Sequence, residues 1–180
     1  MIRYEVIHKQ KIEYRLQERY QQEIKELEAL GFHDLYHTRE VAFPFSALFL
    51  FWLYPILKMN REVLRIEMPL RYVLLNPLLL NREYDTYAHV FGLGTKFATL
   101  FADNTMLITT NYSDTRIVKP EFKIYHYSFP NPTPLGKVWN AHIDHIADIE
   151  TKGRETNSDL SIENFEKIML RDDKALLFGR

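Results

Sequence analysis

The alternation of side chains between residues 84 and 110 constrains the fold of this chain more than any other feature of its sequence. β-branched and aromatic residues occupy every second position in three short runs, and turn-forming residues separate the runs. Gly92-Leu93-Gly94 lies in the first gap and Asp103-Asn104 in the second. A period of two with turns between the runs predicts an antiparallel meander. The runs are 84–91, 95–101 and 106–110.

Two further segments extend the predicted sheet. Residues 122–129 alternate in the same way and predict another strand after a polar loop. The segment 32–39 is short and mixed, which fits either a strand or a connector. We therefore expect an antiparallel sheet of about four or five strands.

Three amphipathic segments predict helices, because their apolar residues recur at steps of three and four. Gly31 follows the first segment and is the usual left-handed helix stop, with Phe32 placed to pack back on the helix. Thr133 is predicted to cap the second segment, with Pro134 at the first helical position. The predicted helices are Ile7–Leu30, Leu135–Thr151 and Ser161–Leu177.

The order of these elements predicts an α+β fold. The sheet is expected to carry the N-terminal helix and the Leu135–Thr151 helix on one face. Residues 1–151, including an apolar insert at 41–80, form the predicted α+β domain. Residues 152–180 form a polar linker and a C-terminal helix.

The insert begins with a run that contains no charge. Val41–Leu57 is 17 residues long and rich in Phe and Leu. A membrane-spanning helix needs about 20 mostly apolar residues. Pro44 and Pro55 shorten the uninterrupted helix further, so the pattern favours a buried or interfacial helix.

Basic residues follow this run and precede a second apolar patch, Met68–Leu80. Basic residues beside an aromatic apolar segment are attracted to an anionic membrane surface. The alternative is an ordinary buried helix followed by an edge strand. The candidate contact residues are Phe49, Phe51, Trp52, Tyr54, Lys58, Arg61 and Arg65.

Composition excludes several classes of function. The chain has no cysteine, which removes disulfides, thiol nucleophiles and thiolate metal sites. The net charge of −1 gives no electrostatic argument for a nucleic-acid partner. The absence of cysteine and of an apolar segment at the N-terminus leads us to expect a cytoplasmic protein, with peripheral membrane contact through the insert.

Three histidines are the candidates for chemistry. His89, His126 and His142 are expected to form a polar pocket with neighbouring tyrosines and aspartates. The alternative is a structural role, in which they pack under a helix and form local hydrogen bonds. His142 and His145 lie one helical turn apart, but no further ligand motif accompanies them, so no metal site, cofactor or catalytic residue is assigned.

The strand-turn-strand run from Phe97 to Thr109 resembles a pattern in a family of uncharacterised bacterial proteins. In that pattern a strand of the form F-x-T-x-F leads through an acidic turn to a strand of the form T-x-L-x-T. Leu30-Gly31-Phe32 and the later Trp139 are similarly placed. The resemblance implies a recurring helix–meander–helix unit, sometimes near membrane-embedded segments, and transfers no catalytic residue.

Three hypotheses of function follow from the sequence. The leading one is a non-enzymatic interaction domain that meets a membrane surface or a protein partner through the insert. The second is a protein that holds a small apolar ligand between the sheet and the insert. The third is an enzyme that uses His89 or His142. Because the predicted sheet is apolar on both faces, a homodimer interface is a further candidate for covering one of them.

Overall fold

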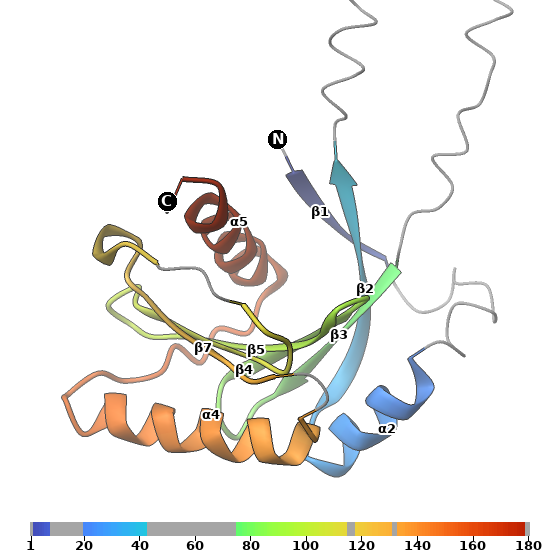
Figure 1. Cartoon of the computed structure of the whole chain (residues 1–180), viewed down its shortest axis with the longest axis horizontal. Coiled ribbons are helices and arrows are strands. Elements are labelled where there is room, and N and C mark those ends of the chain that lie inside the picture. The colour runs from blue at the N-terminus through green and yellow to red at the C-terminus, as the bar shows by residue number, and fades with distance from the viewer. Residues whose placement is uncertain (1, 8–19, 43–74, 115–117, 131–132, 179–180) are drawn as a thin grey trace, which may run out of the picture.

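The structure, a computed structural model, describes residues 2–7, 20–42, 75–114, 118–130 and 133–178. Within these residues seven strands form one sheet whose spatial order follows the chain (Figure 1). Neighbours from β1 to β6 pair antiparallel, and β6 pairs with β7 in parallel. The strands are β1 (Ile2–Ile7), β2 (His33–Ala42), β3 (Leu75–Asn81), β4 (Thr86–Phe91), β5 (Gly94–Leu100), β6 (Met106–Thr110) and β7 (Ile124–Ser128).

Helices cover the sheet on both faces. Helices α2 (Gln21–Ala29) and α4 (Leu135–Glu150) lie on one side of the sheet, and α5 (Ile162–Phe178) lies on the other (Figure 1). A single 3₁₀ turn, η3 (Pro120–Phe122), precedes β7. The α+β class predicted from the sequence is confirmed.

The strict alternation of β4, β5 and β6 builds two separate cores. On the α4 face, Phe32, Phe97 and Trp139 form an aromatic group whose ring centroids lie 4.8 to 5.6 Å apart. On the α5 face, Phe165 packs against Tyr87 among aliphatic side chains from the central strands. Burial on both faces explains why these strands are apolar throughout.

The predicted end of the first helix is confirmed. Gly31 has φ of 85°, and the Phe32 amide donates to the carbonyl of Leu27 at 3.0 Å. This is the six-to-one hydrogen bond of a Schellman turn. Phe32 is fully buried, so the turn directs the chain from α2 into β2.

The predicted beginning of that helix is wrong at Ile7. Ile7 ends β1, and the described helix begins at Gln21; residues 8–19 lie outside the described residues. The alternating residues of β1 pair with β2 over their full length, from Ile2 opposite Ala42 to Ile7 opposite His37. Ile7 lies in a strand because β1 pairs with β2 residues that are 30 to 40 positions away in the sequence, and this pairing overrides local helix propensity.

The number and direction of the strands also differ from the prediction. The sheet has seven strands because β1, β2 and β3 all join it. Strand β7 runs parallel to β6, because the chain has returned to the start of β6 by Ile124, which pairs with Met106. Strand β3 lies in the interior of the sheet and contains Pro77, which has no N–H to donate to a neighbouring strand. Because β4 pairs with β3 only from Leu78 onward, Pro77 faces no β4 partner.

Helix α4 begins at Leu135 as predicted, but its cap differs from the prediction. Pro134 is the N-cap rather than the first helical residue, and the cap position makes no side-chain hydrogen bond. The Thr133 hydroxyl donates to the Pro130 carbonyl. Thr133 therefore lies one position before the cap and does not cap the helix.

Candidate functional site

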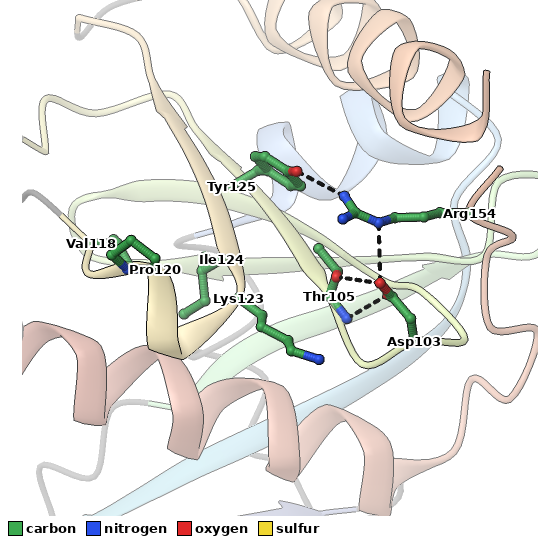
Figure 2. A pocket seen from close by; sticks show the side chains of 8 residues that line it. All are labelled: Asp103, Thr105, Val118, Pro120, Lys123, Ile124, Tyr125 and Arg154. Atoms are coloured by element: carbon green, nitrogen blue, oxygen red, sulfur yellow. Dashed lines mark hydrogen bonds and ion pairs between the residues drawn. The ribbon is translucent and has the colours of Figure 1, made fainter. Parts of the chain in front are cut away.

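A surface hollow of about 410 Å³ lies where the β5–β6 turn, the η3 turn and the linker after α4 meet (Figure 2). Its volume is within the usual range for small-molecule sites. One side is apolar, and the other carries charged and hydroxyl groups. The lining residues are Asp103, Thr105, Val118, Pro120, Lys123, Ile124, Tyr125 and Arg154.

The β5–β6 turn fixes the carboxylate of the hollow. The Thr105 amide donates to Asp103 Oδ1 at 2.9 Å, and the Thr105 hydroxyl donates to Asp103 Oδ2 at 2.9 Å. Asn104 adopts a left-handed conformation with φ of 62°, which asparagine tolerates better than most residues. The amide hydrogen bond from Thr105 is the main reason that the pKa of Asp103 is lowered, so the carboxylate is charged at neutral pH.

Arg154 reaches across the hollow between two partners. Its Nε lies 3.1 Å from Asp103 Oδ2, and its Nη1 donates to the Tyr125 hydroxyl at 2.7 Å (Figure 2). The guanidinium also lies over the Tyr125 ring, 5.7 Å from its centroid. These contacts, first of all the hydrogen bond to Tyr125, raise the pKa of Arg154 and hold its guanidinium in one place.

Lys123 supplies the second cation. It follows η3 in a left-handed conformation with φ of 51°, and its carbonyl accepts a hydrogen bond from the Met106 amide at 2.8 Å. The Lys123 side chain is exposed and makes no hydrogen bond or ion pair with any described residue. Its ammonium group is therefore available to a ligand in the hollow.

No pattern in the sequence indicates this hollow as a unit. Asp103 was predicted as a turn residue and Tyr125 as a strand residue, while Arg154 lies in the segment predicted as a polar linker. That linker is held by the end of β5, because the Ala102 amide donates to the Glu155 carbonyl and the Asn157 amide donates to the Leu100 carbonyl. Only this pairing brings Arg154 to the β5–β6 turn.

A second polar group is buried under α5. Lys96 Nζ lies 2.5 Å from Asp172 Oδ2, and both side chains are less than a tenth exposed. His89, the neighbour of Lys96 across the β4–β5 ladder, contacts the Thr38 hydroxyl at 2.9 Å through Nε2. The Thr38 hydroxyl donates its hydrogen to the Asn76 carbonyl, so Nε2 carries the proton and donates to Thr38.

His142 lies on the opposite face of the sheet. Its Nε2 is 3.0 Å from the Thr99 hydroxyl and its Nδ1 is 2.8 Å from the Thr109 hydroxyl. The Thr86 hydroxyl donates to the Tyr84 carbonyl and lies 2.6 Å from the Thr99 hydroxyl. The hydroxyl chain has one consistent direction: Thr99 donates to Thr86, Nε2–H donates to Thr99, and Thr109 donates to Nδ1. A neutral imidazole satisfies every one of these bonds.

Burial keeps both histidines neutral. Desolvation lowers the pKa of His89 to about 3, with Lys96 as a further cause, and lowers the pKa of His142 to about 3, with His145 as a further cause. Neither ring lines the hollow around Arg154. His126 lies on the α5 face with His89, and its Nε2 is 3.3 Å from Asp114 Oδ2. The predicted polar pocket is thus divided between the two faces.

The predicted contact residues of the insert fall on segment 43–74, which lies outside the described residues. Its two attachment points are described. β2 ends at Ala42, β3 begins at Leu75, and the two strands are paired neighbours with Arg39 opposite Leu75. The insert therefore leaves and re-enters the sheet at adjacent positions.

Comparison with known proteins gives no match, whether to a family model, to a curated protein or to a solved structure. The resemblance to a bacterial family therefore stays a prediction. Of the described helices, none combines the length and apolarity needed to cross a membrane. Within the described ranges, no three His, Asp or Glu residues are grouped so as to hold a metal ion.

Proposed function

We propose that this chain is a non-enzymatic interaction domain that contacts an anionic membrane surface through its apolar insert. The proposal rests on the sequence of the insert and on how the described sheet carries it. The charge-free run Val41–Leu57 supplies apolar and aromatic side chains, and Lys58, Arg61 and Arg65 supply positive charge beside it.

The attachment of the insert is the observation that carries the proposal. Connections between paired antiparallel strands are usually about 2–5 residues long. Here Ala42 and Leu75 enclose residues 43–74, which is 74 − 43 + 1 = 32 residues. A long apolar insertion between two neighbouring strands of a well-packed sheet is typical of a functional segment rather than a connector.

The cover of the sheet supports the same role. Helices α2 and α4 pack on one face and α5 packs on the other. The sequence leaves open whether the insert is an ordinary buried helix or a contact surface. Because described helices lie on both faces, we favour a contact role.

Flotation with liposomes tests the proposal. Full-length protein is mixed with vesicles of phosphatidylcholine containing phosphatidylserine, or with phosphatidylcholine alone, and centrifuged through a density gradient. We expect the protein to float with the anionic vesicles and to be released by salt, because each basic residue near an anionic surface contributes about 1 kcal/mol. Neutral vesicles should retain much less protein.

Matched substitutions locate the contact. Phe51→Asp and Trp52→Asp should abolish flotation, and replacing Lys58, Arg61 and Arg65 by glutamine should weaken it by about a hundredfold if their effects add. Leu93→Asp is the control, since Leu93 is 66% exposed at the β4–β5 turn outside the insert. Dispersed amide resonances from the meander show whether each variant is folded.

Two outcomes would overturn membrane contact. If Phe51→Asp and Trp52→Asp unfold the meander, the insert is part of the core. If the native protein stays out of the lipid fraction and is dimeric by light scattering, the insert serves a protein interface instead. Loss of flotation in Leu93→Asp as well would show that any added acidic group repels the vesicles.

A smaller apolar hollow supports a second candidate function, the binding of a small apolar ligand. It measures about 200 Å³, and Tyr36, Leu78, Leu80 and Tyr87 line it beneath the beginning of α5. This volume suits only a compact ligand, because small-molecule sites usually measure about 300–1,000 Å³. Native mass spectrometry of the purified protein tests this candidate, and a spectrum without any co-purified apolar molecule would count against it.

A further inference from the structure

The hydrogen-bonding groups of the hollow around Arg154 are mainly donors. Among the described residues that line it, Asp103 is the only carboxylate, and both of its oxygens already accept hydrogen bonds from Thr105 and Arg154. Arg154 uses two of its five N–H groups on Asp103 and Tyr125, which leaves three. The Tyr125 hydroxyl accepts from Arg154 and retains its own hydrogen. Lys123 adds three more donors. A ligand that fits this hollow must be rich in acceptors.

The charges of the lining residues indicate the net charge of a ligand that would match the hollow. Among the eight described residues that line the hollow, Arg154 and Lys123 carry two positive charges and Asp103 carries one negative charge. The balance is 2 − 1 = +1, so a ligand with a single negative charge makes the site neutral. A phosphate dianion would leave an excess negative charge beside Asp103.

The remaining lining specifies the body of the ligand. Val118, Pro120 and Ile124 give an apolar wall, which the view in Figure 2 shows on the side opposite Arg154. The ring of Tyr125 adds a flat apolar surface under the guanidinium. The volume of about 410 Å³ exceeds what a small inorganic ion needs and accommodates an organic group.

We propose that this hollow binds a small organic carboxylate. The carboxylate group lies between Arg154 and Lys123, and the apolar body of the ligand packs against Val118, Pro120 and Ile124. The planar fork of a guanidinium matches a carboxylate in a bidentate geometry. Asp103 and Tyr125 act as positioning residues, because they hold the guanidinium before the ligand arrives. The site is independent of the insert and of its proposed contact with a membrane.

Titration with benzoate, followed by NMR, tests the proposal on the full-length chain. Benzoate should shift the Nε–Hε signal of Arg154, the ring signals of Tyr125 and the methyl signals of Val118 and Ile124 in a saturable way. Benzamide has the same shape without the charge and should shift them at least about tenfold more weakly, since a charge-assisted hydrogen bond is about twice as strong as a neutral one. Inorganic phosphate serves as the test of a simple anion site.

Three variants separate the site from general electrostatics. Arg154→Met should weaken benzoate binding by about tenfold, and Arg154→Lys should restore only part of it, because lysine lacks the fork. Lys152→Met is the matched control, since Lys152 lies two residues away, pairs with Asp148 on the surface and does not line the hollow. The Thr105 amide signal reports whether the β5–β6 turn is intact in each variant.

Four results would overturn the proposal. They are equal binding of benzoate and benzamide, unchanged binding in Arg154→Met, an equal loss in Lys152→Met, or saturable phosphate binding with no response to benzoate. None of these results depends on flotation with liposomes, so failure of this site and failure of the proposed membrane contact are distinguishable.

Discussion

The buried histidines His142 and His89 lie on opposite faces of the sheet, in different electrical surroundings. On the α4 face, His142 hydrogen-bonds only to hydroxyl groups, and every hydrogen bond of that chain of hydroxyls joins neutral partners. On the α5 face, His89 lies beside Lys96, whose charge is paired with Asp172 of the helix above. The polar contacts of one face are neutral, and those of the other include a buried ion pair.

This difference shows how each helix is held. The strands supply most of the partners of His142, so α4 is positioned mainly by apolar packing around Trp139 and Ile146. The helix α5 carries a charge that a strand must neutralise, which restricts the helix to the position where Asp172 meets Lys96. Buried ion pairs add little net stability but penalise alternative arrangements.

The largest expected effect comes from breaking the buried ion pair. Asp172→Leu leaves the Lys96 ammonium group buried beside Phe91 without its carboxylate. We expect the free energy of unfolding to fall by about 3–5 kcal/mol, measured by urea denaturation. The double variant Lys96→Met with Asp172→Leu should recover most of that loss. An equally unstable double variant would show that the two charges do not act as a pair.

On the neutral face, removing one hydroxyl should have a smaller effect. Thr109→Val keeps the shape of the side chain but removes the hydrogen that His142 Nδ1 accepts. The expected loss is about 1–3 kcal/mol in the same urea experiment, because a buried acceptor loses its partner. Thr109→Ser is the control and should recover part of the loss. If valine and serine behave alike, packing rather than the hydrogen bond is responsible.

The pH dependence of stability compares the two histidines directly. Both have a folded-state pKa of about 3, below the unfolded value of about 6.5, so between these values the unfolded state binds more protons. The contribution of each histidine to the free energy of unfolding should therefore be fully present above about pH 6.5. Below that pH, the free energy of unfolding should fall by about 1.4 kcal/mol per pH unit for each histidine. Urea denaturation between pH 6 and 5 measures the slope.

Substitution of one histidine sharpens that comparison. His142→Gln should reduce the slope by about half, leaving the contribution of His89. Lys96→Met should raise the pKa of His89, because the neighbouring charge is one cause of its low value. A slope that is the same in wild type and in His142→Gln would contradict a neutral buried His142.

The smallest effect is expected far from both faces. Lys152 and Asp148 form an exposed pair four residues apart, 2.6 Å between Nζ and Oδ2. Lys152→Met should leave the free energy of unfolding almost unchanged, since exposed pairs contribute little. A loss comparable to that of Asp172→Leu would remove the contrast between buried and exposed charges on which the comparison rests.

The meander and the last two helices could be predicted because their signals are local. Alternation in β4, β5 and β6 and the four-residue steps of α4 and α5 are visible within each segment. β1 and the direction of β7 could not be predicted in this way, since both depend on partners distant in the sequence. For His142 the alternative of a residue that packs locally and forms local hydrogen bonds agrees with the structure, in which its ring lies 5.7 Å from that of Trp139.

The hollow around Arg154 was not predictable, because its residues come from three separate segments. No local pattern joins Asp103, Lys123, Tyr125 and Arg154. The pairing of the linker with the end of β5 brings Arg154 to the turn, and the return path through η3 brings Lys123 there. A pattern search that considers each segment by itself cannot detect such a site.

By itself the sequence determined the α+β class, the alternating core strands, the stop at Gly31 and the apolar, basic-flanked insert. These follow from side-chain period and backbone preference, which act over a few residues. Only the tertiary structure decided that α5 covers the second face, that Lys96 meets Asp172, and that Arg154 completes a hollow with Asp103. Such contacts join residues 51 to 76 positions apart, and they form only when the whole sheet brings their segments together.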